Sequence, residues 1–221
     1  ENPQMLEALE ALFMRVAEET KVLPIGGGLF SPFNPHEMKR STNTEWTLFE
    51  GMTRIPESQA PNVRNGNIRA EVEAEVPADV NGVIFAMGGY AGGVSLYALN
   101  GELRYEYSAL LLKRDKINVG KLPPGKVKIE FEMKTPLERA APAEVAFWIN
   151  GKKAATGTVQ RTVPLTFTAS ETFDVGSDTS SPVADDYFEK APFRFEGTLK
   201  RLYFKNLQDE RPAFKRSPDD D

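Results

Sequence analysis

Acidic side chains gather in one stretch near the C-terminal end of the chain. The segment 173–187 carries Asp174, Asp178, Asp185 and Asp186, with serine and threonine between them. Clustered carboxylate and hydroxyl oxygens suit Ca²⁺, which takes six to eight oxygen ligands. The spacing does not match an EF-hand loop, and acidic residues in loops are usually just solvated. These four aspartates are the candidate metal ligands, and Ca²⁺ is the one candidate cofactor.

The chain offers few residues that could serve nucleophilic catalysis. The chain has no cysteine, which removes disulfides, thiolate zinc sites and cysteine nucleophiles. Its single histidine, His36, stands in a proline-rich connection with no nucleophile motif beside it. A Ser-His-Asp triad and a histidine metal site are therefore not predicted. A glycosidase carboxylate pair cannot be singled out among 32 acidic residues. We expect no catalytic and no cofactor-binding residues in this chain.

A glycine-rich run, Met87 to Gly93, has the composition of a phosphate loop but not its context. A phosphate loop follows a strand, opens a helix and usually ends in Lys-Ser/Thr. Here the run leads into Val94-Ser95-Leu96-Tyr97, which has the character of a strand. Glycines in such places commonly mark a close approach of two backbones. We interpret the run as a connection between two strands.

Aromatic side chains offer a platform for sugar rings, but most fit a core pattern. The six considered are Trp46, Tyr90, Tyr97, Tyr105, Tyr107 and Trp148. Trp148 stands in the apolar run 145–149, which predicts a buried position. Only Tyr90 is placed outside a core pattern.

One segment predicts a helix. Over residues 3–22, apolar side chains recur at steps of three and four through Leu6, Leu9, Phe13 and Val16. Asn2 and Pro3 suit an N-cap and first helical residue, and the glycines at 26–28 end the pattern.

The remaining chain predicts strands. Apolar and charged residues alternate along 68–76 and again along 127–134, as in strands with one wet face. Asn100-Gly101 and Asn150-Gly151 each lie between such segments and favour type I′ hairpins. We expect about eleven strands: 45–55, 67–76, 82–88, 94–99, 102–108, 116–119, 125–135, 143–149, 152–160, 163–169 and 196–206. The fold class is a mostly β, antiparallel sandwich with one N-terminal helix.

The composition limits the classes of partner that we expect for this chain. The formal net charge is -5 and basic residues are scattered among acids, so a nucleic-acid partner is not expected. No apolar run is long enough for a membrane span. Residues 1–10 are acidic and helical, which does not suit a signal peptide. We expect a mature or excised piece of a longer protein, with a frayed acidic tail at 208–221.

Several motifs, in order along the chain, resemble the C-terminal region of large bacterial arylsulfatases. They are 13–24 (FMRVAEETKVLP), 51–57 (GMTRIPE), 60–63 (APNV), 92–97 (GGVSLY), 148–153 (WINGKK), 161–164 (RTVP), 171–176 (ETFDVG), 178–179 (DT), 181–183 (SPV) and 192–198 (PFRFEGT). The resemblance reaches to about residue 205. It implies a concanavalin-A/laminin-G-like jelly roll appended to a sulfatase α/β domain, and a periplasmic or secreted location.

The resemblance also shows what this chain lacks. Such sulfatases hydrolyse sulfate esters with a formylglycine made from the Cys or Ser of C/S-x-P-x-R, beside a divalent cation. The chain has no cysteine and no Ser-x-Pro-x-Arg motif, so no catalytic residue is carried over. The implied organisation is the end of the sulfatase region at 1–25, a linker at 26–43, the β-sandwich at 44–207 and the tail.

Two functions follow from these observations. The first is a non-catalytic accessory domain of an arylsulfatase-like hydrolase, packed on the sulfatase catalytic domain or shaping the rim of its active site. The second is a stand-alone jelly-roll module that binds carbohydrate. In the first, the expected interdomain contacts are Leu6, Leu9, Phe13, Met52, Arg54 and Asn62. The helix stripe could instead join two copies of the chain in a homodimer.

Overall fold

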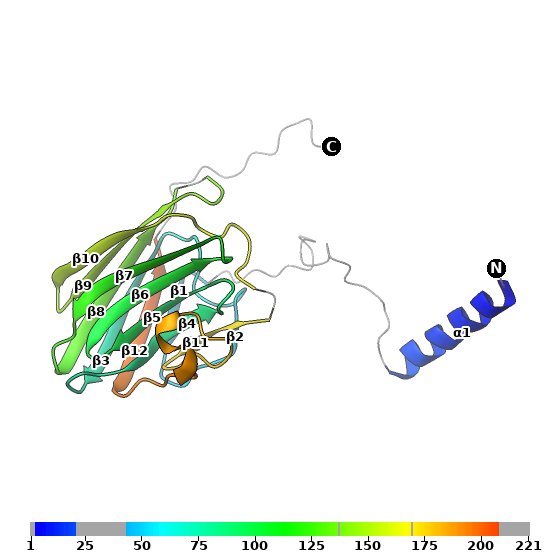
Figure 1. Ribbon diagram of the computed structural model, residues 1–221, viewed down its shortest axis with the longest axis horizontal. Coiled ribbons are helices and arrows are strands. Elements are labelled where there is room, and N and C mark those ends of the chain that lie inside the picture. Colours follow the sequence, from blue (N-terminus) through cyan, green and yellow to red (C-terminus); the bar gives the residue numbers. More distant parts are fainter. Residues whose placement is uncertain (1–2, 21–42, 137, 169, 208–221) are drawn as a thin grey trace. The chain divides into compact units, whose positions relative to one another are not determined.

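The computed structural model describes residues 3–20, 43–136, 138–168 and 170–207 (Figure 1). The chain divides into two compact units, residues 1–41 and 42–221, and each is described by itself. Among the described helices, none combines the length and apolar character that crossing a bilayer requires.

The first unit contains α1 (Pro3–Glu19). The helix ends near Thr20, whose N–H and hydroxyl both donate to the Val16 carbonyl oxygen, at 2.9 and 2.7 Å. Its apolar stripe is on the surface: the side chains of Leu6, Leu9 and Phe13 are 55–60% exposed. The helix is therefore amphipathic, as the sequence predicts. Residues 21 and 22 of the expected helix, the linker up to residue 42, and the tail from 208 lie outside the described residues.

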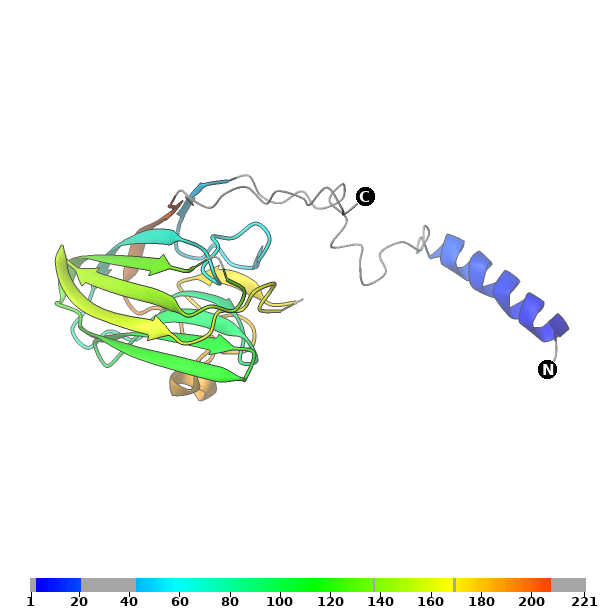
Figure 2. The same cartoon turned by 90° about the horizontal axis from the view of Figure 1, so that it is seen from above.

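The second unit is a sandwich of two antiparallel six-stranded sheets (Figures 1 and 2). Sheet A has the order β1 (Glu45–Leu48), β12 (Thr198–Asn206), β3 (Ile68–Val76), β8 (Gly125–Lys134), β9 (Ala143–Ile149) and β10 (Lys152–Val159). Sheet B has the order β2 (Ile55–Pro56), β11 (Thr172–Val175), β4 (Gly82–Gly88), β5 (Gly93–Leu99), β6 (Glu102–Ala109) and β7 (Lys113–Lys121). A 3₁₀ helix, η2 (Asp185–Lys190), precedes β12. The mostly β, antiparallel sandwich with one N-terminal helix is confirmed.

Aromatic rings from both sheets fill the core. Phe85 of sheet B stacks on Phe173 at 5.7 Å and meets the edge of Phe204, from sheet A, at 5.4 Å. Phe131 of sheet A lies 5.4 Å from Tyr105 of sheet B. Each of these rings is at most 1% exposed. Aromatic pairs at such distances add roughly 0.5–1.5 kcal/mol each beyond their buried area, so they hold the two sheets together.

Both predicted Asn-Gly hairpins are present. Asn100 and Gly101 have φ of 53° and 76°, and Asn150 and Gly151 have φ of 50° and 74°. Positive φ at both central residues gives the turn a twist that matches its strands. The run 87–93 also joins two strands, because Gly88 closes β4 and Gly93 opens β5, opposite each other. It is not a phosphate loop.

Some expected strands are wrong. The segment 163–168 forms no strand, although Val163 and Phe167 are buried core residues. Residues 45–55 are interrupted by a turn, which leaves β1 and the two-residue β2 in different sheets. β11 lies within the motif that predicted an acidic loop, and β7 runs beyond the expected 116–119. A buried loop replaces the expected strand at 163–168, and β2 and β7 are the edge strands of sheet B.

Candidate functional site

The outward faces of the two sheets differ. Residues 177–196 pack on the outside of sheet B, where Val183, Ala184 and Tyr187 cluster with Val83 and Tyr97. The outward residues of sheet A remain half-buried to exposed, as the alternating burial of β3 and β8 shows. We call this outward side of sheet A the open face. A ligand can reach the side chains of the open face directly.

One cross-strand row on the open face carries two aromatic rings. Register pairs join Tyr203 of β12 to Glu71 of β3, then Glu71 to Glu130 of β8. Glu130 is opposite Trp148 of β9, and Trp148 is opposite Lys153 of β10. Three strand spacings of about 4.8 Å place Trp148 roughly 14 Å from Tyr203 along this row. The row therefore spans the width of an oligosaccharide rather than of a single small molecule.

Trp148 is the main correction to the sequence interpretation. The apolar run 145–149 predicts that it is buried, but the strand alternates strictly. Val145 and Phe147 point into the core, whereas Ala146 and Trp148 point outward and are half-buried. The signal was present in the period of two, and the apolar neighbour Ala146 concealed it. A tryptophan on a wet sheet face is the feature that separates this face from an ordinary charged surface.

The other candidate aromatics are placed elsewhere. Tyr97, Tyr105 and Tyr107 are at most 1% exposed and belong to the interior. Trp46 packs partly against the core, and its indole N–H donates to the Gln59 carbonyl oxygen at 2.9 Å. Tyr90 is 39% exposed, as expected, but it lies on the sheet B side, under the Arg114 guanidinium.

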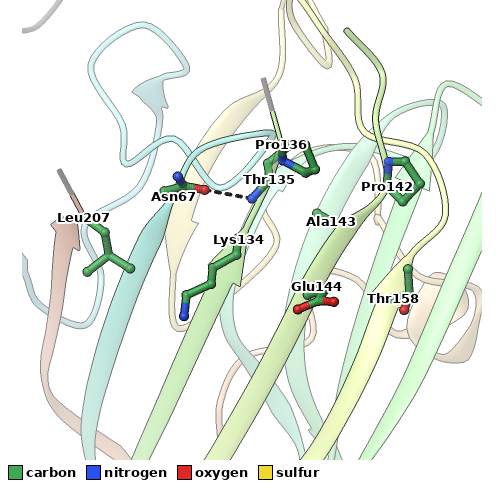
Figure 3. A pocket seen from close by; sticks show the side chains of 9 residues that line it. All are labelled: Asn67, Lys134, Thr135, Pro136, Pro142, Ala143, Glu144, Thr158 and Leu207. Carbon is green, nitrogen blue, oxygen red and sulfur yellow. Dashed lines mark hydrogen bonds between the residues drawn. The ribbon is translucent and has the colours of Figure 1, made fainter. Parts of the chain in front are cut away.

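A groove of about 620 Å³ lies at one end of the open face (Figure 3). Lys134, Glu144 and Thr158 stand on three adjacent strands along it. The other lining residues are Asn67, Thr135, Pro136, Pro142, Ala143 and Leu207. Asn67 Oδ1 accepts the Thr135 N–H at 2.7 Å, which fixes the start of the connection above the groove. The groove thus has hydroxyl, amine and carboxylate groups on its floor and proline rings at its rim.

Trp148 and the groove are on the same path. Along β9 the outward residues are Glu144, Ala146 and Trp148. Residues two apart in a strand are about 7 Å apart, so Trp148 lies about 13 Å from Glu144 of the groove, with Ala146 between them. Because Ala146 is small, the surface between them stays low. An extended ligand can rest on the ring and continue into the groove.

Ion pairs cross the open face between neighbouring strands. Arg69 pairs with Glu130 at 2.6 Å, and Lys128 with Glu71 at 3.0 Å. Along β8 itself, Lys134 pairs with Glu132 at 2.9 Å. The carboxyl groups beside Trp148 therefore lie among cations of the same face, and their oxygens can accept further hydrogen bonds.

Asp178 lies in the buried layer on the other side of the sandwich. Its Oδ2 accepts the Val183 N–H at 2.9 Å and the Tyr187 hydroxyl at 2.7 Å. Burial raises the pKa of the Asp178 carboxyl to about 6, and the Asp174 and Glu171 charges add to the rise. The two hydrogen bonds act in the opposite direction and do not cancel it.

Asp186 belongs to a separate network. Its carboxylate accepts from the Tyr97 hydroxyl at 2.8 Å, from Arg104 at 2.7 Å and from Lys116 at 3.2 Å. Burial would raise its pKa, but these three donors outweigh burial and lower it. Asp185 is half exposed and 3.8 Å from the Lys116 ammonium.

Asp174 has a structural role on β11, between β2 and β4 of sheet B. Its Oδ1 accepts the Arg54 N–H at 2.7 Å, and its Oδ2 accepts the N–H and hydroxyl of Thr179 at 3.0 and 2.6 Å. The four candidate aspartates are thus divided among different partners. No group of three or more His, Cys, Asp or Glu side chains that could hold a metal ion occurs in the described part of the chain. His36 lies outside that part.

The expected interdomain residues of the sandwich unit are at its surface to different degrees. Met52 is 39% exposed, and Arg54 is exposed, with a positive φ of 60°. Asn62 is half-buried and serves its own loop, since its side chain donates to Asn65 Oδ1 and accepts the Asn65 N–H. Whether these residues contact another domain remains a prediction.

A surface feature that the sequence interpretation missed lies at the β6–β7 hairpin. Leu110, Leu111 and Leu112 are 43–69% exposed at its tip. The turn is closed by the Leu112 N–H to the Ala109 carbonyl oxygen at 3.0 Å, and its central residues Leu110 and Leu111 have φ of 54° and 60°. Leucine in this backbone region is strained by roughly 1–2 kcal/mol per residue. The signal was the sequence LLL between the largely buried strand β6 and the polar edge strand β7.

Comparison with known proteins gives structural neighbours only. No family model matches the chain, and no curated protein matches it. The mouse laminin alpha1 chain, domains LG4-5, is similar with a TM-score of 0.42 and 14% identity over 78% of this chain and 42% of that one. The Ruminococcus gnavus IT-sialidase CBM40 bound to alpha2,3 sialyllactose is similar with a TM-score of 0.49 and 13% identity, over 76% of this chain and 92% of that one. Domain 4 of the Geobacillus stearothermophilus arabinanase AbnA, in complex with arabinotriose, is similar with a TM-score of 0.44 and 12% identity, over 76% of this chain and 78% of that one.

The chain spans less than half the length of the laminin structure.

Proposed function

We propose that the sandwich unit is a non-catalytic carbohydrate-binding module and that its binding surface is the open face. The observation that supports this most is the outward position of Trp148, in one cross-strand row with Tyr203 and on the same outward side of β9 as Glu144 of the groove. A sugar ring has one apolar C–H face and a polar edge. It therefore stacks on an aromatic ring while its hydroxyls reach the polar groups beside that ring.

The polar groups near Trp148 suit hydroxyl recognition. Glu130 and Lys153 flank the ring in the register row, and Lys134, Glu144 and Thr158 continue along the groove. Carboxylates accept hydrogen bonds from sugar hydroxyls, and ammonium and hydroxyl groups donate to their oxygens. Because these side chains project from adjacent strands, their spacing is fixed by the sheet. The face is pre-formed for an extended ligand.

Hydrolysis by this face is not part of the proposal. A glycosidase needs a pair of carboxyl groups, one of which acts as the general acid. On the open face, Glu130 and Glu71 are instead each paired with a cation, Arg69 and Lys128. We therefore propose that the open face binds sugar without cleaving it.

Titration of the full chain with a panel of oligosaccharides tests the proposal, with Trp148→Ala as the key variant. We expect binding by the unchanged chain and a loss of up to about tenfold in affinity for Trp148→Ala, since a stacked aromatic contributes roughly 0.5–1.5 kcal/mol beyond the area that it buries. Tyr90→Ala is the matched control, because it removes an exposed ring on the sheet B side. Equal affinity in both variants, or no binding to any oligosaccharide, would contradict the proposal.

A second candidate function rests on the strained leucine hairpin. In an arylsulfatase-like protein the sandwich unit would serve as an accessory domain, periplasmic or secreted, packed on the sulfatase catalytic domain. Exposed apolar side chains held in an unfavourable backbone conformation are a reason to expect a contact surface there. Leu111 and Leu112 would be buried in that contact.

The reading frame that encodes this chain provides the first test of the second candidate. A frame that continues upstream into a C/S-x-P-x-R motif supports it, and a frame without such a domain refutes it. In the longer protein, Leu111→Asp should weaken the attachment of the two domains. Limited proteolysis would then release the sandwich unit faster than from the unchanged protein.

A further inference from the structure

From the exposure of the charges on the open face, we infer that its ligand is an acidic glycan, a sugar chain bearing sulfate or carboxylate groups. This inference rests on the proposed carbohydrate-binding function and names the class of sugar. Opposite charges alternate over the whole face, so the number of charges does not decide the class. What decides it is which charges a ligand meets first.

In the ion pairs around Trp148 the cation is more exposed than its carboxylate. The side chains are 45% exposed for Arg69 against 12% for its partner Glu130. The values are 63% for Lys134 against 19% for Glu132, and 44% for Lys128 against 26% for Glu71. Lysine and arginine have longer stems than glutamate, so the carboxylates lie low on the sheet and the cationic ends stand above them. A ligand that approaches this region meets ammonium and guanidinium groups.

The asymmetry is confined to the part of the face that holds Trp148. Toward the β1 edge the paired side chains are equally exposed: Arg201 and Glu73 at 41% and 45%, and Lys205 and Glu45 at 53% and 50%. Near β8 and β9 the cations dominate the surface. The exposed cations Arg69, Lys128 and Lys134 therefore lie on the same part of the open face as the half-buried Trp148.

Lys153 adds a further cation to this region. It lies opposite Trp148 in the register, on an exposed position of the edge strand β10. Within the described residues, no carboxylate is placed within ion-pair distance of its ammonium group. A sulfate or carboxylate on a sugar stacked on Trp148 would give Lys153 an opposite charge at short range. Charge-assisted hydrogen bonds of this kind are about twice as strong as neutral ones.

The groove end of the path has a different character. Glu144 is exposed there, opposite Lys134 in the register. A carboxylate at this position accepts hydroxyl hydrogens and repels acidic groups. The acidic substituent is therefore placed at the Trp148 end, and the next sugar unit presents hydroxyls to the groove.

The experiment compares three oligosaccharides with the same backbone: a sulfated form, a carboxylated form and the neutral form. Each is titrated into the full chain, Lys153→Gln, Trp148→Ala and the control Lys121→Gln, which removes an exposed lysine of sheet B. We expect at least one acidic form to bind about tenfold more tightly than the neutral form, as 1.4 kcal/mol corresponds to a factor of ten. The two acidic arms distinguish sulfate from carboxylate as the recognised group.

The variants separate this inference from the proposed function. Lys153→Gln should remove most of the preference for the acidic form over the neutral form. Trp148→Ala should weaken the binding of both forms, and Lys121→Gln should weaken the binding of neither. Equal binding of acidic and neutral forms by the unchanged chain overturns the inference and leaves carbohydrate binding standing. Full binding of the acidic form by Trp148→Ala also overturns it, because the attraction is then unspecific. A chain that binds none of the three forms refutes both.

Discussion

The buried carboxyl group of Asp178 makes the stability of the sandwich depend on pH in an unusual direction. Its pKa is about 6 in the folded chain against 3.8 for an ordinary aspartate. Between these values the folded state holds the proton more tightly than the unfolded state does. The free energy of unfolding therefore falls as the pH rises through this window. One pKa unit corresponds to about 1.4 kcal/mol, so the loss from this group amounts to about 3 kcal/mol.

Asp178→Asn removes this dependence with little change in shape. Both hydrogen bonds of the carboxylate reach the same atom, Oδ2, from Val183 and Tyr187. The amide oxygen of asparagine can occupy that position and accept both. We expect the variant to gain about 3 kcal/mol relative to the unchanged chain between pH 4 and pH 7. Urea unfolding followed by circular dichroism at several pH values measures this difference.

Asp186→Asn is the matched control, with the opposite sign. The pKa of Asp186 is lowered, so its contribution to stability is present at neutral pH and is lost as the pH falls below about 4. This variant should be less stable than the unchanged chain at pH 7, and the gap should narrow in acid. If the stability gap between Asp178→Asn and the unchanged chain is the same at pH 4 and pH 7, the burial argument for Asp178 is refuted.

Three further predictions concern stability. Replacing Leu110-Leu111 by Asn-Gly should raise the free energy of unfolding by about 2 kcal/mol, because both residues have positive φ; a loss of stability would contradict the strain argument. Millimolar Ca²⁺ and EDTA should give the same melting temperature, and a clear rise with Ca²⁺ would revive a metal site at the aspartates. Phe131→Ala should lower stability by about 3–5 kcal/mol in urea unfolding, since its ring contacts Phe85, Tyr105 and Phe147, and a loss under about 1 kcal/mol would contradict the packing.

The sequence predicted the strands whose side chains alternate in polarity. β3 and β8 each have one face in the core and one face in water, so period two is visible in the letters. The Asn-Gly hairpins follow from a backbone requirement that few other residues meet. β11 was harder, because Phe173, Asp174 and Val175 are all buried and show no alternation. In that strand the aspartate is satisfied by hydrogen bonds that include one from a residue far along the chain, which local patterns do not reveal.

The candidate site was only partly predictable. Counting acids pointed to segment 173–187, but the tertiary structure divides those aspartates among amide, hydroxyl and cationic partners. Trp148 could have been found by following the register of β9 strictly from Val145. The cross-strand row that joins Trp148 to Tyr203 includes two pairings, β12 with β3 and β3 with β8, between residues over 50 positions apart, which a single sequence does not specify.

The fluorescence of Trp148 tests the carbohydrate-binding proposal most directly. The chain has two tryptophans, so Trp46→Phe leaves Trp148 as the single indole. Saturation of this variant with an oligosaccharide that binds the unchanged chain should shift the Trp148 emission to shorter wavelength and protect it from acrylamide, because a stacked sugar ring excludes water from the indole face. If the emission and the quenching of Trp148 stay the same while the sugar is bound, the ligand sits elsewhere and the proposed role of the open face is wrong.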